Sequence, residues 1–401
     1  MFPYAFAKIR QHQPAVRRLP ETDRGAVRGV MLSSIPYHGK PTEVFAYIGY
    51  PAGAGPHKPV PGVVLVHGGG GSAFPQWVER WNRRGYAAIA LDLEGHIPDD
   101  PNECAIVLHT HETAGPCRRD DFSDVVGDSP EAPEDQWFTH ALAAIFAGHA
   151  VLRNDPCVRT EQIGICGISW GGILTSMAIC ADDYAFAVPI YGCAHLAEGG
   201  TYLADWYQKP QMAAWDWSDW LSGVKIPVLW QCGTDDVHFS PLSLSLCCRD
   251  VTGSVLSLVP GMEHGHGAWD RPEAYAFADS VCFGTPGLVD VMNHPCAWEH
   301  FCEFRGPYEM LPVKVETVYA MDGLRYDRAA RACLTEWATV PRRGGPGEGV
   351  SGSFVPVDVP YGAKAFFVHI TDGRGLEVAS RVVTLPQAAA PGSPDFLEKP
   401  E

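Results

Sequence analysis

Short apolar runs alternate with segments of helical periodicity between about residues 40 and 285. The run PGVVLVHGGGG (61–71) is apolar up to its glycines, which is typical of a strand buried on both faces. Further strands are predicted at EVFAYIGYP (43–51), AAIALDL (87–93), QIGICGIS (162–169), FAVPIYG (186–192) and PVLWQCG (227–233). Helices are predicted between them, at WVERWNRRG (77–85), over 134–154 and over 171–180. This alternation predicts an α/β fold with a doubly wound, mostly parallel sheet.

The pattern changes near residue 300 to short runs separated by turn residues. These runs are LPVKVETVYA, GSFVPVDVP, AKAFFVHITD and LEVASRVVTLP, and one helix is expected over DRAARACLTEWA (327–338). Such a pattern predicts a small antiparallel, β-sandwich-like domain. We therefore expect a large domain over 1–298, with an N-terminal extension and a Trp-rich insert at about 195–222, then a β-domain over 299–387. A flexible tail over 388–401 and a loop over 96–133 are also predicted.

The bulk composition restricts the partners and the compartment. Of the 401 residues 46% are hydrophobic and 19% charged, as in ordinary folded proteins. The net charge of −17 argues against nucleic acid or an anionic membrane as a partner and disfavours polyanionic substrates. Thirteen cysteines without a CxxC pair favour buried thiols over a disulfide scaffold or a zinc site. No apolar run reaches ~18 residues, so we expect a cytoplasmic protein unless a leader was removed.

One serine stands among four glycines in GICGISWGGIL (164–174). A serine hydroxyl must be exposed, positioned and deprotonated before it can act as a nucleophile. The pattern G-x-S-x-G places the serine in a sharp turn between a strand and a helix, and here a buried strand precedes it and an apolar helix follows. A plain glycine-rich turn is the alternative. We interpret Ser169 as a nucleophile, with Gly167 and Gly171 flanking it because a side chain there would clash.

The second motif is HGGGG (67–71), directly after the strand VVLV. Acyl transfer places negative charge on a carbonyl oxygen, and fixed backbone N–H groups stabilise it. Gly69 and Gly70 are the predicted donors, beside the amide of Trp170, and His67 is a candidate substrate contact. A flexible turn and a phosphate cradle are the alternatives, although no G-K-[ST] follows.

Two further motifs supply acids and bases, QCGTDDVHFSP (231–241) and LVPGMEHGHGAWD (258–270). Each follows an apolar strand, so Asp235, Asp236, His264 and His266 are expected in loops at strand ends. The order Ser…Asp…His is that of an α/β-hydrolase triad, in which the histidine is the base and the carboxylate orients it. A metal site built from the same side chains is a weaker alternative, because it leaves both glycine motifs unexplained.

Together these blocks resemble the α/β-hydrolase superfamily, and within it the dienelactone-hydrolase/acetyl-xylan-esterase-like group. The resemblance covers about residues 40–285, including GISWGG, LWQCGTDD and MEHGHGAW. It implies hydrolysis of carboxylic esters, often acetyl groups on carbohydrates, without a cofactor or metal. It assigns the acid to Asp236 and the base to His264. The elbow carries serine, unlike the cysteine of dienelactone hydrolase itself.

The insert HLAEGGTYLADWYQKPQMAAWDWSDWLSG is rich in tryptophan. Trp206 and Trp217 are candidates for a lid or a sugar-stacking wall over Ser169, and packing of the insert onto the core is the alternative.

The sequence predicts a serine esterase for a small-molecule ester, with acetyl as the preferred acyl group and a neutral, polar alcohol that resembles a carbohydrate. An amidase or peptidase with the same triad, and a non-catalytic binding protein on this fold, are the alternatives. Homo-oligomerisation is left open.

Overall fold

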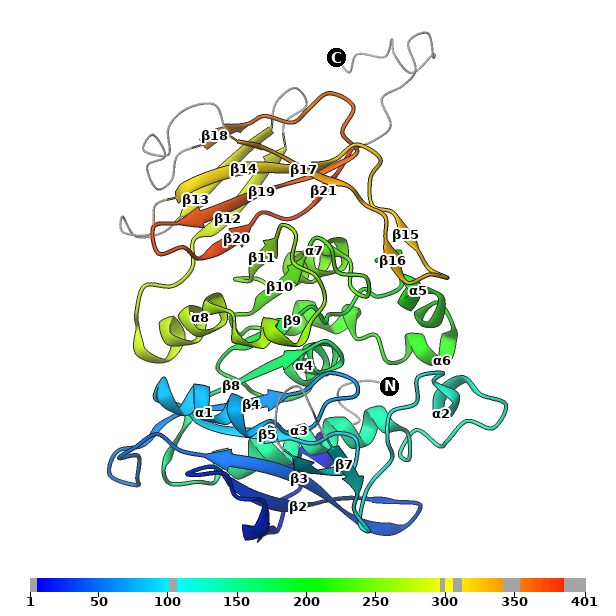
Figure 1. Cartoon of the computed structure of the whole chain (residues 1–401), viewed down its shortest axis with the longest axis vertical. Coiled ribbons are helices and arrows are strands. Elements are labelled where there is room, and N and C mark those ends of the chain that lie inside the picture. Colours follow the sequence, from blue (N-terminus) through cyan, green and yellow to red (C-terminus); the bar gives the residue numbers. More distant parts are fainter. Residues whose placement is uncertain (1–5, 101–106, 296–299, 306–311, 342–353, 386–401) are drawn as a thin grey trace.

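The structure is a computed structural model that describes residues 6–100, 107–295, 300–305, 312–341 and 354–385. The predicted tail over 388–401 lies outside these residues. A single large mixed sheet runs along the molecule (Figure 1). Its first nine strands, in spatial order, are β1 (Val16–Arg18), β2 (Arg28–Tyr37), β3 (Lys40–Gly49), β5 (Ala87–Leu91), β4 (Val60–Val66), β8 (Val158–Ile168), β9 (Ala187–Ile190), β10 (Leu229–Gly233) and β11 (Val255–Val259).

The six strands from β5 to β11 are parallel, as the alternation of strands and helices predicts. Every residue of β5, β9 and β10 is buried, which is expected where helices cover both faces of a sheet. The longer helices are α1 (Pro75–Arg83), α3 (Trp137–Arg153), α4 (Trp170–Ala181), α7 (Pro241–Asp250) and α8 (Pro272–Phe283). The α/β class with a mostly parallel core is therefore confirmed.

Helices pack on the sheet through aromatic and aliphatic side chains. Trp81 of α1 contacts Tyr275 of α8 edge to face, with ring centroids 4.9 Å apart, so these two helices lie side by side. Helix α3 packs along β2, β5 and β8, and α4 packs on β8 and β9. None of the described helices is long and apolar enough to cross a membrane.

The region 96–133, predicted as a loop, contains short elements. Strands β6 (His96–Asp100) and β7 (Val107–Thr110) pair in antiparallel orientation, and α2 (Ser123–Val126) follows. The Trp-rich insert forms α5 (Tyr202–Tyr207) and α6 (Pro210–Ala213). Asp216 holds the ends of the insert together, because its carboxylate accepts hydrogen bonds from the amides of His195 and Leu196 at 3.1 and 2.8 Å. Short 3₁₀ turns occupy Ile9–Gln11, Pro20–Thr22, Ser218–Gly223 and His266–Asp270.

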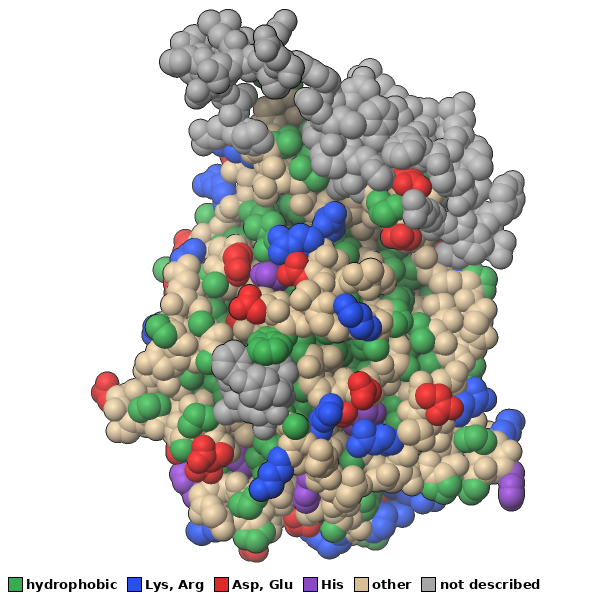
Figure 2. All heavy atoms as spheres, turned by 180° about the vertical axis from the view of Figure 1, so that it is seen from behind, with side chains coloured by type: hydrophobic (Ala, Val, Ile, Leu, Met, Phe, Trp, Pro, Cys, Tyr) green, Lys and Arg blue, Asp and Glu red, His purple; other side chains and the backbone are tan. Residues whose placement is uncertain are grey.

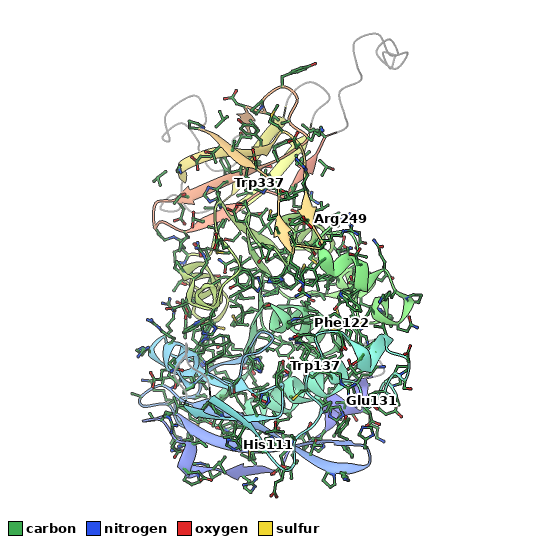
Figure 3. The ribbon with its side chains drawn as sticks, turned by 45° about the vertical axis from the view of Figure 1, so that its right-hand side comes forward. His111, Phe122, Glu131, Trp137, Arg249 and Trp337 are labelled. Atoms are coloured by element: carbon green, nitrogen blue, oxygen red, sulfur yellow. The ribbon has the colours of Figure 1, made fainter. Side chains whose placement is uncertain are left out.

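The C-terminal strands are antiparallel, as predicted, but no separate sandwich is shown. They are β12 (Asp290–Pro295), β13 (His300–Arg305), β14 (Pro312–Ala320), β15 (Tyr326–Asp327), β16 (Ala332–Cys333), β17 (Trp337–Pro341), β18 (Phe354–Val357), β19 (Ala365–Asp372), β20 (Glu377–Ala379) and β21 (Val383–Thr384). Strand β20 pairs with β11, so β20, β19, β14 and β17 extend the central sheet. Strands β12, β13 and β18 form a three-stranded sheet of their own. Trp337 of β17 (Figure 3) packs on Phe367 of β19 at 5.3 Å.

The helix predicted over 327–338 is wrong. This segment contains the β15–β16 hairpin and the start of β17 instead. The carboxylate of Asp327 accepts the amide of Ala330 at 2.8 Å, and Arg331 adopts a left-handed conformation with φ of 51°. Both features close a tight turn and interrupt the helical hydrogen-bond pattern.

A partly buried ion cluster ties β20, one of the C-terminal strands, to the start of helix α8. Arg271 lies between Glu273 and Glu377, at 3.0 and 2.6 Å, and Glu273 is fully buried. The backbone amide of Glu377 also donates to Glu273 at 3.0 Å. The His369 ring and Arg271 lower the pKa of Glu377 to about 2.

Glu377→Ala is expected to lower the free energy of unfolding by about 2 kcal/mol, because Arg271 loses a charged hydrogen-bond partner. Since the folded pKa lies below the unfolded value of about 4.3, this contribution is complete above pH ~4.3 and disappears as the pH falls toward 2. Urea unfolding at several pH values measures it. The exposed carboxylate of Glu336 provides a matched control, Glu336→Ala. Equal stability of the two variants at neutral pH would contradict the proposed tie.

Candidate active site

Ser169 occupies a strained turn between β8 and α4. Its backbone angles are φ 57° and ψ −120°, a combination that L-residues rarely adopt. The turn is tight because a Cβ atom on Gly167 would lie 2.2 Å from the Gly171 carbonyl oxygen. A Cβ on Gly171 would lie 2.2 Å from the carbonyl oxygen of Val66 in β4. Both glycines are therefore required by close approach of the backbone, as the G-x-S-x-G pattern predicts.

Three predicted side chains form one hydrogen-bonded chain. The Nε2 atom of His264 lies 3.0 Å from the Oγ atom of Ser169, and its Nδ1 atom lies 2.8 Å from Oδ2 of Asp236. A neutral ring with its proton on Nδ1 donates to Asp236 and can accept the serine proton on Nε2. The ring of Tyr191 lies against His264, with centroids 4.3 Å apart. The geometry is that of a serine activated by an oriented base.

The carboxylate of Asp236 is held in place by burial and by hydrogen bonds from backbone amides. It is fully buried, and its Oδ1 atom accepts the amides of His238 and Phe239 at 2.7 and 2.8 Å. Asp235 is exposed instead and accepts the Thr234 hydroxyl at 2.7 Å. The structure thus places Asp236, and not Asp235, against His264.

The two proposed amide donors of the acyl oxygen lie on either side of Ser169. Trp170 is the first residue of α4, so its N–H has no acceptor within the helix. Gly69 lines both cavities that meet at Ser169. Gly70 lines only the second cavity, and its amide donates a hydrogen bond to Glu94. Burial raises the pKa of Glu94, and this hydrogen bond lowers it in part. Gly69 and Trp170 are therefore the better-placed pair of donors.

His67 does not lie in either cavity, which corrects the prediction that it contacts substrate. Its ring is 2% exposed, and its Nε2 atom accepts the amide of Leu93 at 2.9 Å. Its Nδ1 atom lies 2.6 Å from the Gly68 carbonyl oxygen. Burial lowers the pKa of His67 to about 4, so the ring is neutral and can serve both contacts. It connects the glycine loop to the chain after β5.

The insert tryptophans also lie outside both cavities. Trp217 is 1% exposed and packs on Phe6 at 5.4 Å, so the prediction of a substrate contact for it is wrong. Trp206 lies behind Phe122, at 5.0 Å, and carries the Lys209 ammonium over its ring. Of these aromatic side chains only Phe122, labelled in Figure 3, reaches the first cavity. The tryptophans of the insert therefore pack against neighbouring aromatic side chains, the alternative that the sequence left open, while Tyr202 of the same insert lines the first cavity.

The two cavities differ in chemistry. The first, of about 270 Å³, carries several polar and charged side chains: Arg118, Asp120, Tyr202, His238 and Arg331. The second, of about 430 Å³, is lined by the glycine loop and by Phe74, Ile168, Tyr191 and His266. His266 stacks on Trp77 and also lines this second cavity. Arg118 and Arg331 were not predicted from the sequence, because Arg118 lies in the segment predicted as a loop and Arg331 in the segment predicted as a helix.

Comparison with known proteins identifies the fold and leaves the activity open. No protein-family profile and no curated protein sequence matches the chain. The structure of acetyl xylan esterase from Paenibacillus sp. R4 matches with a TM-score of 0.53 at 15% identity, covering 70% of this chain and 92% of that one. Acetyl xylan esterase 1 from Thermoanaerobacterium sp. JW/SL YS485 matches at 13% identity with a TM-score of 0.49, covering 66% and 86%. Acylaminoacyl peptidase from Pyrococcus horikoshii matches at 17% identity with a TM-score of 0.44, covering 66% and 40%.

The match to the Paenibacillus esterase structure thus shows that the chain has an α/β-hydrolase-like fold. Among the described residues, no group of three or more His, Cys, Asp or Glu side chains could hold a metal ion.

The two adjacent aspartates provide a matched test of the orienting role. Asp236→Asn is expected to lower kcat for an activated ester by roughly 10⁴-fold, because the amide no longer fixes the ring of His264 in the productive tautomer. Asp235→Asn removes the same charge one residue away and is expected to change kcat less than about threefold, since exposed charges couple weakly to the site. Steady-state kinetics of both variants measure the difference. A larger loss in Asp235→Asn would mean that the orienting carboxylate is wrongly assigned.

Proposed function

We propose that the protein is a serine hydrolase that cleaves a carboxylic ester through an acyl-enzyme. The observation that carries this proposal is the continuous chain from Ser169 through His264 to Asp236, which opens onto a cavity. The similarity to esterase structures supports it at the level of the fold. The proposed role of each group follows from its position in this chain.

Attack by Oγ of Ser169 on the acyl carbonyl forms a tetrahedral intermediate, while Nε2 of His264 takes the hydroxyl proton. The amides of Gly69 and Trp170 donate to the oxyanion, and the N-terminal end of α4 favours negative charge at the same place. His264 then returns the proton to the leaving alcohol. In the second half, water attacks the acyl-enzyme, with His264 again as the base. Asp236 stabilises the imidazolium form of His264 in both halves.

A small acyl group, acetyl above all, is the proposed substrate feature, with a carbohydrate-like alcohol. The first cavity is small, at about 270 Å³, and the rigid rings of Trp170 and Phe122 bound it. Matching esterase structures are named for acetyl xylan. Location in the cytoplasm is part of the proposal, because the cysteines described in the structure are free thiols.

The acyl-size proposal predicts the order acetyl, butyryl, octanoyl for kcat/KM on 4-nitrophenyl esters, with acetyl at least about tenfold above octanoyl, because a long apolar chain would desolvate the charged side chains Arg118, Asp120 and Arg331 of the first cavity. Ser169→Ala should lose this activity while its circular dichroism spectrum is unchanged. An acetylated sugar and the acetyl amide of 4-nitroaniline, the amide counterpart of 4-nitrophenyl acetate, complete the panel. Faster turnover of the amide than of the ester would favour an amidase, and activity retained by Ser169→Ala would exclude the proposed mechanism.

A further inference from the structure

The β15–β16 hairpin of the C-terminal region completes the wall of the active site. It descends from the C-terminal strands to α5 (Figure 1). Arg328 in its turn donates to the Gly200 carbonyl oxygen at 3.1 Å and pairs with Asp205 of α5 at 2.5 Å. On the other strand, the Cys333 thiol lies 3.7 Å from the carbonyl oxygen of Thr234, two residues before Asp236. The hairpin is therefore fixed at both sides of the first cavity.

This anchoring delivers Arg331 to the cavity that contains Ser169 and His264. The guanidinium lies over the ring of Tyr202, 4.5 Å from its centroid. Among the described residues, no carboxylate lies within ion-pair distance of Arg331, whereas Arg118 pairs with Asp120 and Arg328 with Asp205. Its left-handed backbone, with φ of 51°, is unusual for a side chain of this size. Within the described part of the chain no side chain accepts a hydrogen bond from this guanidinium, and donors without a partner are suited to bind an anion.

A second arginine, Arg118 in the segment between β7 and α2, lines the same cavity. Arg118 is 13% exposed and lies over the ring of Trp170, with 5.1 Å to the centroid. Asp120 at 2.7 Å and the buried Glu94 at 3.7 Å share its charge. Arg118 is thus partly compensated by carboxylates, whereas Arg331 has no carboxylate partner in the part of the chain that the structure describes.

We propose that the first cavity binds an oxyanionic group of the substrate, a carboxylate or a phosphate, through Arg331 with support from Arg118. The proposal rests on the ester hydrolysis proposed above and specifies its substrate class: an ester that carries an anionic group near the scissile bond. A carbohydrate ester with an acidic substituent meets both requirements.

This substrate differs from the neutral alcohol expected from the net charge of −17. On the face shown in Figure 2, acidic and basic side chains are interspersed and do not form one acidic field. Charges more than about 8 Å away are largely screened at physiological salt, so the local arginines decide the preference of the cavity.

Paired substrates test the proposal on both sides of the scissile bond. For an anion on the alcohol, the acetyl esters of 4-hydroxybenzoate and 4-hydroxyphenyl phosphate are compared with that of 4-hydroxybenzamide. For an anion on the acyl group, the 4-nitrophenyl ester of glutarate is compared with that of glutaramate. The quantity measured is the ratio of kcat/KM for the anionic and the neutral member of each pair. The two alcohol-side anions distinguish a carboxylate from a phosphate.

In the wild-type protein at least one of these ratios is expected to be about 10, which corresponds to the free energy of one hydrogen bond to a charged group. Arg331→Met should return that ratio to near 1, and Arg331→Lys should restore part of it. Arg325→Met is the matched control, because Arg325 lies on the same hairpin, outside the cavity, and pairs with Asp322. Ratios near 1 in every wild-type pair, or equal effects of Arg331→Met and Arg325→Met, would overturn the proposal.

A binding measurement separates this proposal from the proposed hydrolysis. Ser169→Ala protein is titrated calorimetrically with 4-acetamidobenzoate and with its neutral amide, neither of which needs to react. The benzoate is expected to bind about tenfold more tightly, and the difference should vanish in the Ser169→Ala, Arg331→Met double variant. Equal binding of both compounds would overturn anion recognition even if ester hydrolysis is confirmed. Preferential binding without ester hydrolysis by the wild type would overturn the hydrolase function alone.

Discussion

The close backbone approach of β4, β8 and α4 is the constraint on which the site depends. Gly167 and Gly171 allow the strand and helix to meet so closely that any side chain at either position would overlap a carbonyl oxygen. The result is the strained backbone of Ser169, a conformation that costs about 1–3 kcal/mol and is held by the packed sheet around it. This turn places the Ser169 hydroxyl within hydrogen-bond distance of His264 and beside the glycine loop (Gly68–Gly71).

A second requirement is the burial of an anion where it can orient the base. Asp236 is completely buried, yet two backbone amides and the His264 ring satisfy its carboxylate. A buried carboxylate without such partners would be costly. The loop after β10 therefore does two things at once: it stabilises the charge of Asp236 and fixes the direction from which His264 approaches Ser169.

The parts of the site that follow local rules could be predicted from the sequence. The glycine pattern around Ser169 requires one backbone geometry, and each triad residue follows a recognisable strand. The choice of Asp236 over Asp235 came from the family resemblance, and the structure explains it by burial. Arg331 could not be found, because its segment has helical spacing and becomes a hairpin only through contacts with Gly200, Asp205 and Thr234. His67 and Trp217 were overvalued for a related reason: motif position does not reveal whether a side chain points to a cavity or to the core.

The central claim is that His264 activates Ser169 as a nucleophile, and active-site labelling tests it most directly. The native protein is treated with a fluorophosphonate, digested, and analysed by mass spectrometry for the modified peptide. The account predicts stoichiometric modification of Ser169 in the wild type and loss of rapid labelling in His264→Gln, because an unassisted serine hydroxyl reacts slowly. Labelling at another residue, or equally fast labelling of Ser169 without His264, would contradict it.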